Sequence, residues 1–113
     1  MNEQLVLAVD YVVKELEQAG KERGLSEHLR ADALEVIADT RGRLEFVLTT
    51  GGPHVALTLG DGFPRVLGHW GPDTWSAQAD IEASEVEETF EKFWRITMER
   101  AFKPSASIHF DRD

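Results

Sequence analysis

The sequence predicts one two-layer α+β domain, with a helix at each end and an antiparallel sheet between them. Two observations predict this class. Residues 2–22 and 81–102 place apolar side chains at the three-and-four spacing of an amphipathic helix. The middle of the chain instead alternates apolar and polar residues in short runs, which Gly- and Pro-containing turns separate. We therefore expect a single α+β domain over residues 1–113.

The first predicted helix covers residues 2–22. Its apolar stripe consists of Leu5, Val9, Val12, Leu16 and Ala19. Glu17 precedes Lys21 by four residues, which is the order that stabilises a helix. Gly24 follows, and glycine is the residue type that most often stands just past a helix C-terminus. The helix is expected to end there.

Two interpretations stay open for the segment after Gly24. In the first, Ser26 caps a second helix that carries Leu29, Ala33, Val36 and Ile37 on one face. In the second, a strand over residues 34–38 turns at residues 39–42 and returns along residues 44–50. The turn sequence Asp-Thr-Arg-Gly and the apolar runs on both sides of it favour the strand.

The middle of the chain predicts a meander. Its strands are residues 43–50, 54–59, 63–70 and 74–79, and the open segment before them would add a fifth. The turns between these strands are Gly51-Gly52-Pro53, Gly60-Asp61-Gly62 and Gly71-Pro72-Asp73. Connections this short join antiparallel neighbours. We expect a four- to five-stranded antiparallel meander.

The last predicted helix covers residues 81–102. Its apolar stripe consists of Val86, Phe90, Phe93, Trp94, Thr97 and Ala101. Ser84 and Glu87 have the spacing of a capping box. We expect Phe90, Phe93 and Trp94 to be core residues that pack this helix on one face of the sheet. The tail from Pro104 either frays or adds an edge strand.

Composition excludes several classes of protein. The chain has 113 residues, 42% of them hydrophobic and 29% charged, as in ordinary globular domains. It contains no Cys, which excludes disulfides, thiolate metal sites and a cysteine nucleophile. No run approaches the roughly 18 apolar residues of a membrane span, and the N-terminus lacks the basic flank of a secretory signal. We expect a cytoplasmic protein that does not contact membranes.

The negative charge lies on the two terminal segments, residues 1–41 and 80–102, and spares the middle of the chain. The net charge is −9, and residues 80–102 hold seven acidic against three basic residues. Most of these acids lie in the first half of the helix: Glu82, Glu85, Glu87, Glu88 and Glu91. Such a field repels nucleic acid and attracts basic protein surfaces. The competing interpretation is that the acidity only keeps the protein soluble.

No pattern indicates catalysis. Acids at a helix start are stabilised in their ionised form by the helix dipole, whereas a catalytic pair needs a desolvated site. The chain has no phosphate-binding loop, and its histidines lack the H-x-x-x-H spacing of a metal site: His28, His54, His69 and His109. We expect no enzyme, no metal and no organic cofactor. His54 and His69 lie on neighbouring predicted strands, where they could face each other near Asp73.

Two aromatic residues complete the predicted partner-binding surface. Trp70 and Trp75 bracket one turn at the end of the sheet. Large exposed aromatic side chains are frequent anchors of protein interfaces. We therefore group both with the acidic residues as partner-binding candidates. The alternative is that both pack into the core.

The middle of the chain resembles small acidic proteins carried by phages and prophages. In these, a strand runs into Gly-Gly-Pro, a second strand follows, and a Trp-Gly turn closes the third. The matching residues, in LTTGGPHVALTLGDGF and VLGHWGPDTW, are Gly51, Gly52, Pro53, Trp70 and Gly71. The resemblance covers roughly a quarter of the chain. It implies a mobile-element setting, in which small acidic domains often inhibit host defence enzymes that handle nucleic acid, and it implies no catalytic residues.

These observations lead to one functional hypothesis and three alternatives. The first is an anti-CRISPR-like or restriction-inhibiting nucleic-acid mimic, a monomer or homodimer that occupies the basic groove of its partner and does not bind nucleic acid itself. The second is an immunity or antitoxin-like protein that blocks a basic toxin. The third is a small ligand-binding domain on the face of His54 and His69. The fourth is a structural virion component.

Overall fold

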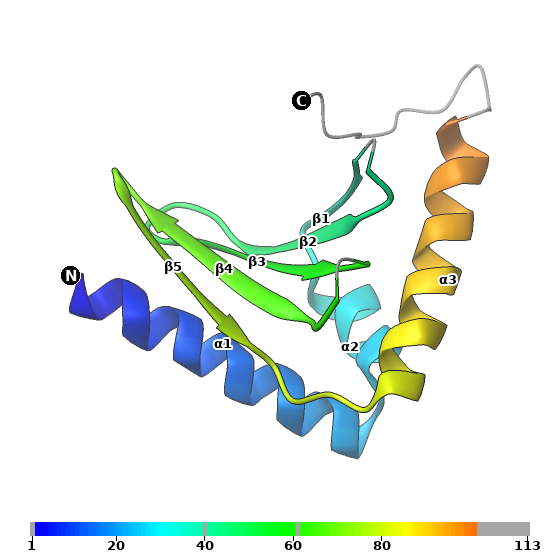
Figure 1. The fold of residues 1–113 in the computed structure, drawn as a ribbon, viewed down its shortest axis with the longest axis horizontal. Coiled ribbons are helices and arrows are strands. Elements are labelled where there is room, and N and C mark those ends of the chain that lie inside the picture. The colour runs from blue at the N-terminus through cyan, green and yellow to red at the C-terminus, as the bar shows by residue number, and fades with distance from the viewer. Residues whose placement is uncertain (1, 40, 61, 102–113) are drawn as a thin grey trace.

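The computed structural model describes residues 2–39, 41–60 and 62–101. In chain order its elements are α1 (Glu3–Glu22), α2 (Leu25–Asp32), β1 (Glu35–Ala38), β2 (Leu44–Thr49), β3 (His54–Leu59), β4 (Arg65–Trp70), β5 (Asp73–Gln78) and α3 (Ala83–Ala101). The five strands form one antiparallel sheet in the order β1-β2-β3-β4-β5 (Figure 1). The predicted α+β class and the meander are confirmed.

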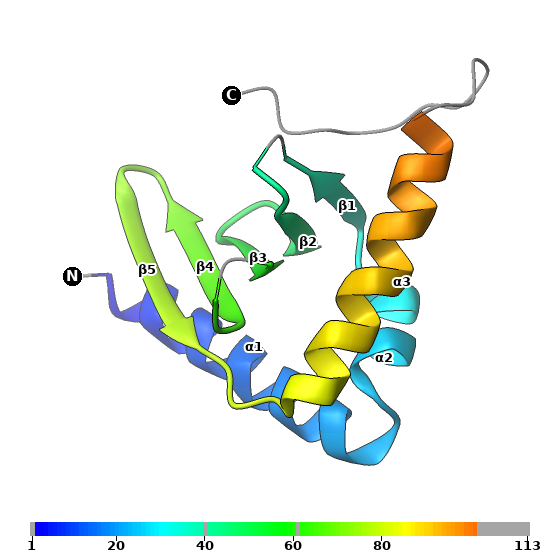
Figure 2. The ribbon, with the colours of Figure 1, turned by 45° about the vertical axis from the view of Figure 1, so that its right-hand side comes forward.

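The helices divide the sheet between them. α1 packs along β4 and β5, α3 packs against β1 and β2, and α2 contacts both of these helices. Figures 1 and 2 show α2 at the corner where α1 and the start of α3 meet. The arrangement gives each long helix one half of the sheet to cover.

The core lies between the helices and one face of the sheet. One row of apolar residues crosses all five strands: Val36, Phe46, Leu57, Val66 and Ala77. The α1 side chains Leu5 and Val9 are fully buried against this face. A Cβ atom at Gly68 of β4 would lie 2.6 Å from Val9 Cγ2 and 2.9 Å from Leu5 Cδ1. The glycine therefore allows α1 to approach the sheet closely.

The segment after Gly24 combines both interpretations. It holds the short helix α2 and then the strand β1. The helix ends because Leu34 N donates to Val47 O at 2.8 Å, so the chain joins the sheet. The predicted cap at Ser26 is wrong: Gly24 is the N-cap and no side chain of α2 caps it. Ser26 Oγ instead forms a hydrogen bond of 2.7 Å with Thr89 Oγ1 of α3.

Asp39 holds the turn between β1 and β2. Its Oδ1 accepts hydrogen bonds from Arg41 N at 2.9 Å and Arg43 N at 2.8 Å, and its Oδ2 accepts one from Arg43 Nε. Burial raises the pKa of Asp39, but the hydrogen bonds from Arg43 and Arg41 and the positive charge of Arg43 lower it more. The net result is a pKa below the ordinary value.

α3 begins two residues earlier than a capping box at Ser84 requires. Its first residue is Ala83, and Val86 N donates to Glu82 O, so Ser84 lies inside the helix and the predicted capping box is wrong.

Phe90, Phe93 and Trp94 are partly buried and pack against the core cluster, so they are not the fully buried core residues that were predicted. Residues 104–113, where the edge strand was considered, lie outside the described residues.

Two ring contacts fix the apolar side of α3. The ring of Phe93 meets the ring of Phe46 edge-on, at a centroid distance of 5.1 Å. Phe90 stacks on Trp94 at a centroid distance of 5.5 Å.

Within the described part of the chain, no helix is long and apolar enough to cross a membrane.

Candidate functional site

Four of the five predicted acidic residues are exposed around the start of α3. We call them the acidic surface: Glu82, Glu87, Glu88 and Glu91. Among the residues that the structure describes, no ion pair joins any of these four carboxylates to a basic side chain. Their negative charge is therefore not paired within the part of the chain that the structure describes.

Glu85 differs from the other acids of the run. It is partly buried, and its Oε1 accepts a hydrogen bond of 2.8 Å from Leu25 N, the first residue of α2. The N–H groups of a first helical turn lack partners inside the helix and carry a partial positive charge. Glu85 thus caps α2 from another helix, and Thr89 one turn later binds Ser26. The sequence analysis placed Glu85 with the partner-binding acids, yet its carboxylate has a structural contact.

Two adjoining hollows lie beside the acidic surface. The first is lined by Gly60, Gly62, Ser84, Val86, Phe90 and three residues of the acidic surface, namely Glu87, Glu88 and Glu91. The second is lined by Gly62, Phe63, Pro64, Ile81, Ala83, Val86 and Glu87. The side chain of Phe63 is 72% exposed, more than any other large apolar side chain that the structure describes. Apolar surface and unpaired carboxylates therefore adjoin each other.

The sequence analysis missed Phe63. It placed this residue at the start of a strand, whereas β4 begins at Arg65. Pro64 was the sign in the sequence that the strand begins later, because proline lacks the N–H that a residue inside a strand donates to the neighbouring strand. A strand that starts after Pro64 leaves Phe63 in the turn, next to α3.

Trp70 and Trp75 are partly buried and pack against the core cluster. The Trp70 ring lies 3.5 Å from the position of a Cβ atom at Gly52. Trp75 Nε1 is buried and has no hydrogen-bond partner in the described part of the chain. Neither side chain is a largely exposed anchor, and the partner-binding role of both stays a prediction.

His54 and His69 lie opposite each other on β3 and β4, as expected. Their ring centroids are 6.2 Å apart. The nearest acidic group that pairs with them is Glu45 of β2, whose Oε2 lies 4.0 Å from His54 Nε2. Asp73 instead occupies the register position opposite Trp70. The pair lies on the sheet face opposite the apolar row of Phe46, Leu57 and Val66.

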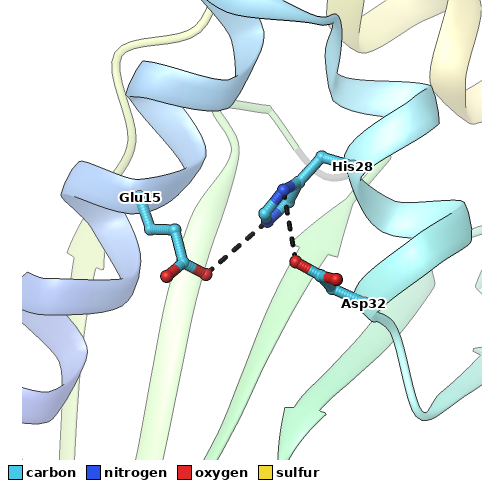
Figure 3. A group of neighbouring side chains, drawn as sticks. All are labelled: Glu15, His28 and Asp32. Atoms are coloured by element: carbon cyan, nitrogen blue, oxygen red, sulfur yellow. Dashed lines mark ion pairs between the residues drawn. The ribbon is translucent and has the colours of Figure 1, made fainter.

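A second polar cluster joins α1 to α2 (Figure 3). His28 is only 5% exposed, and its Nε2 lies 3.6 Å from Glu15 Oε1 while its Nδ1 lies 3.4 Å from Asp32 Oδ2. Arg23 Nη2 lies 2.9 Å from the same Nδ1. The sequence analysis missed this cluster because its members come from two helices, one of which it left open. The signal was the four-residue spacing of His28 and Asp32 on α2.

No family model matches this chain, and comparisons with curated proteins and with solved structures give no match. The acidic surface and its hollows can take up positively charged and apolar groups together. The carboxylates there are exposed to water, whereas acid–base catalysis needs a desolvated cleft.

Proposed function

We propose that this protein is a non-catalytic binding protein that docks on a basic protein surface through the acidic surface and the two hollows beside it. The observation that carries the proposal is that Glu87 lines the same hollow as the largely exposed ring of Phe63, while Glu88 and Glu91 line the hollow next to it. Lys and Arg side chains of a partner satisfy the carboxylates. An apolar side chain of the partner packs on Phe63.

Both parts are needed for a stable complex. An exposed ion pair contributes only about 0–1 kcal/mol, so charge mainly speeds and orients association. Apolar side chains that lose their contact with water on binding carry most of the affinity at protein interfaces. In the second hollow Phe63, Ile81 and Val86 supply apolar surface, and Glu87 borders it.

A groove that holds phosphates is one class of surface that fits this description. Its Lys and Arg side chains are spaced to bind an array of negative charges, which Glu87, Glu88 and Glu91 also present. Occupying such a groove would inhibit a nucleic-acid-processing complex, for example a defence enzyme of a host. A basic toxin would dock in the same way, which makes an immunity-like inhibitor the second candidate.

The test uses a labelled peptide in which Arg and Leu alternate, and a matched peptide in which Ser replaces Leu. The variant reverses Glu87, Glu88 and Glu91 to Lys. A control variant makes the same charge change at acids elsewhere on the helices: Asp10, Glu22 and Glu99. We expect the wild type and the control to bind the Leu peptide and the reversed variant to lose binding, at equal melting temperatures.

Salt and the second peptide separate the two contributions. Binding should weaken as salt rises, because charges are screened over about 8 Å at physiological ionic strength. The Ser peptide should bind more weakly than the Leu peptide, and Phe63→Ala should remove that difference. Equal loss of binding in the reversed and control variants would show an effect of net charge alone and would refute this docking site.

A further inference from the structure

We propose that Glu15, His28 and Asp32 form a binding site for one divalent transition-metal ion at the corner between α1 and α2. One possible ligand atom from each residue lies within 4.8 Å of those of the other two. Imidazole nitrogen and carboxylate oxygen are ligands that Zn²⁺ and its neighbours in the first transition row accept. Two ligands come from α2 and one from α1, so a bound ion would join the helices.

Neither carboxylate makes a good hydrogen bond to the imidazole ring, so both are available to an ion. The nitrogen–oxygen distances of 3.6 and 3.4 Å exceed the 2.7–3.2 Å of a good hydrogen bond. Ligands about 2.1 Å from a tetrahedral ion are about 3.4 Å from each other. One ring nitrogen would ligate the ion, so the carboxylate at the other nitrogen has to rotate. The Glu15 and Asp32 side chains are 45% and 48% exposed, which leaves both free to do so.

The site is open on one side. A shallow depression reaches the cluster from solvent, with Tyr11, Lys14 and Gln18 on its walls. An ion can enter there, and a water molecule can take the fourth position, as in other zinc sites with three protein ligands. Figure 3 shows both carboxylates turned toward the imidazole ring. His28 is held in place by burial, so the least mobile ligand is already positioned.

Arg23 competes with the ion. Its Nη2 lies 2.9 Å from His28 Nδ1 and 3.7 Å from Asp32 Oδ2, so its positive charge already partly compensates the Asp32 carboxylate. The Arg23 side chain is 51% exposed and can turn into solvent when an ion binds. Removing the charge of Arg23 should therefore tighten metal binding. If the cluster were only a hydrogen-bond network, removing the charge of Arg23 would not increase its affinity for a metal ion.

The test measures zinc binding by calorimetry and cobalt binding by visible absorption, on tag-free protein dialysed against a chelator. We expect one Zn²⁺ per chain in the wild type. Glu15→Gln and Asp32→Asn should each lower the affinity by about tenfold or more, since even loss of an outer-shell partner costs about 10–100-fold. Glu27→Gln, an exposed neighbour of His28, is the matched control and should bind like the wild type.

Two further comparisons decide the proposal. Arg23→Gln should bind Zn²⁺ more tightly than the wild type. The visible absorption of Co²⁺ bound at a four-coordinate site should be present in the wild type and absent in His28→Gln. The variants at Glu15 and Asp32 change partly exposed side chains, so they remain informative where His28→Gln fails to fold. Absence of saturable one-to-one binding in both the wild type and Arg23→Gln overturns the site. Equal affinities of Glu15→Gln and Glu27→Gln also overturn it.

Discussion

Replacing Glu85 with Ala should destabilise the protein, although neighbouring glutamates of α3 can be replaced at no cost. The carboxylate accepts a hydrogen bond of 2.8 Å from the backbone nitrogen of Leu25. The side chain of Leu25 is fully buried. Loss of a helix cap costs about 0.5–2 kcal/mol, and a hydrogen bond to a charged group contributes about 1.5–3 kcal/mol. Because Glu85 is only partly buried, we expect a loss of about 1–2 kcal/mol.

Urea denaturation followed by circular dichroism measures this loss. In a domain of this size, each kcal/mol lowers the melting temperature by about 4–8 °C. Glu88→Ala is the matched control, because Glu88 is exposed and its removal relieves repulsion with Glu91 three residues later. Its stability should equal or slightly exceed that of the wild type. The proposed cap is refuted when Glu85→Ala and Glu88→Ala unfold at the same urea concentration.

Two other predictions concern the core and the first turn of the sheet. Phe93→Ala should lower the free energy of unfolding by about 2–3 kcal/mol, less than the 3–5 kcal/mol of a fully buried Phe, because Phe93 is partly buried against Phe46; an unchanged denaturation midpoint would contradict this packing. Asp39→Asn should cost on the order of 1–2 kcal/mol at pH 7. The lowered pKa means that the ionised carboxyl stabilises the fold above the ordinary value of 3.8 and that this stabilisation is lost as pH falls through the folded value. Melting curves of wild type and variant should therefore converge at acidic pH, and a constant difference would contradict the role given to Arg43.

The periodicity of the sequence was sufficient to predict the sheet and the two long helices. Strands such as His54–Leu59 alternate between faces, and a one-residue slip would move every apolar side chain to the wrong side. Positive-φ glycines such as Gly60, which has φ of 100°, separate the strands. Local pattern and turn chemistry agree in this region, so the register follows from the sequence.

Local pattern was insufficient where a contact spans the chain. The start of α2 has no side-chain cap of its own, because the capping group, Glu85, lies 60 residues further along. The prediction that Ser26 caps α2 was therefore wrong. In the cluster around His28, the contact with Glu15 could not be predicted for the same reason, because Glu15 approaches from α1. Pairs that meet only through tertiary packing leave no spacing signal in a single sequence.

The helical period divides one acidic run between a buried and an exposed side of α3. At about 100° per residue, Glu85 and Thr89 fall on one side of α3, within about 40° of each other. Counted in one direction from Glu85, Glu87, Glu91 and Glu88 lie at about 200°, 240° and 300°, outside the sector of Glu85 and Thr89. No basic residue in the described chain pairs with these three acids. The aromatic residues of α3 lie between these two sides and meet the sheet. The contacts with α2 therefore fix the rotation of α3 about its axis, and that rotation holds the remaining acids at the surface as a fixed array.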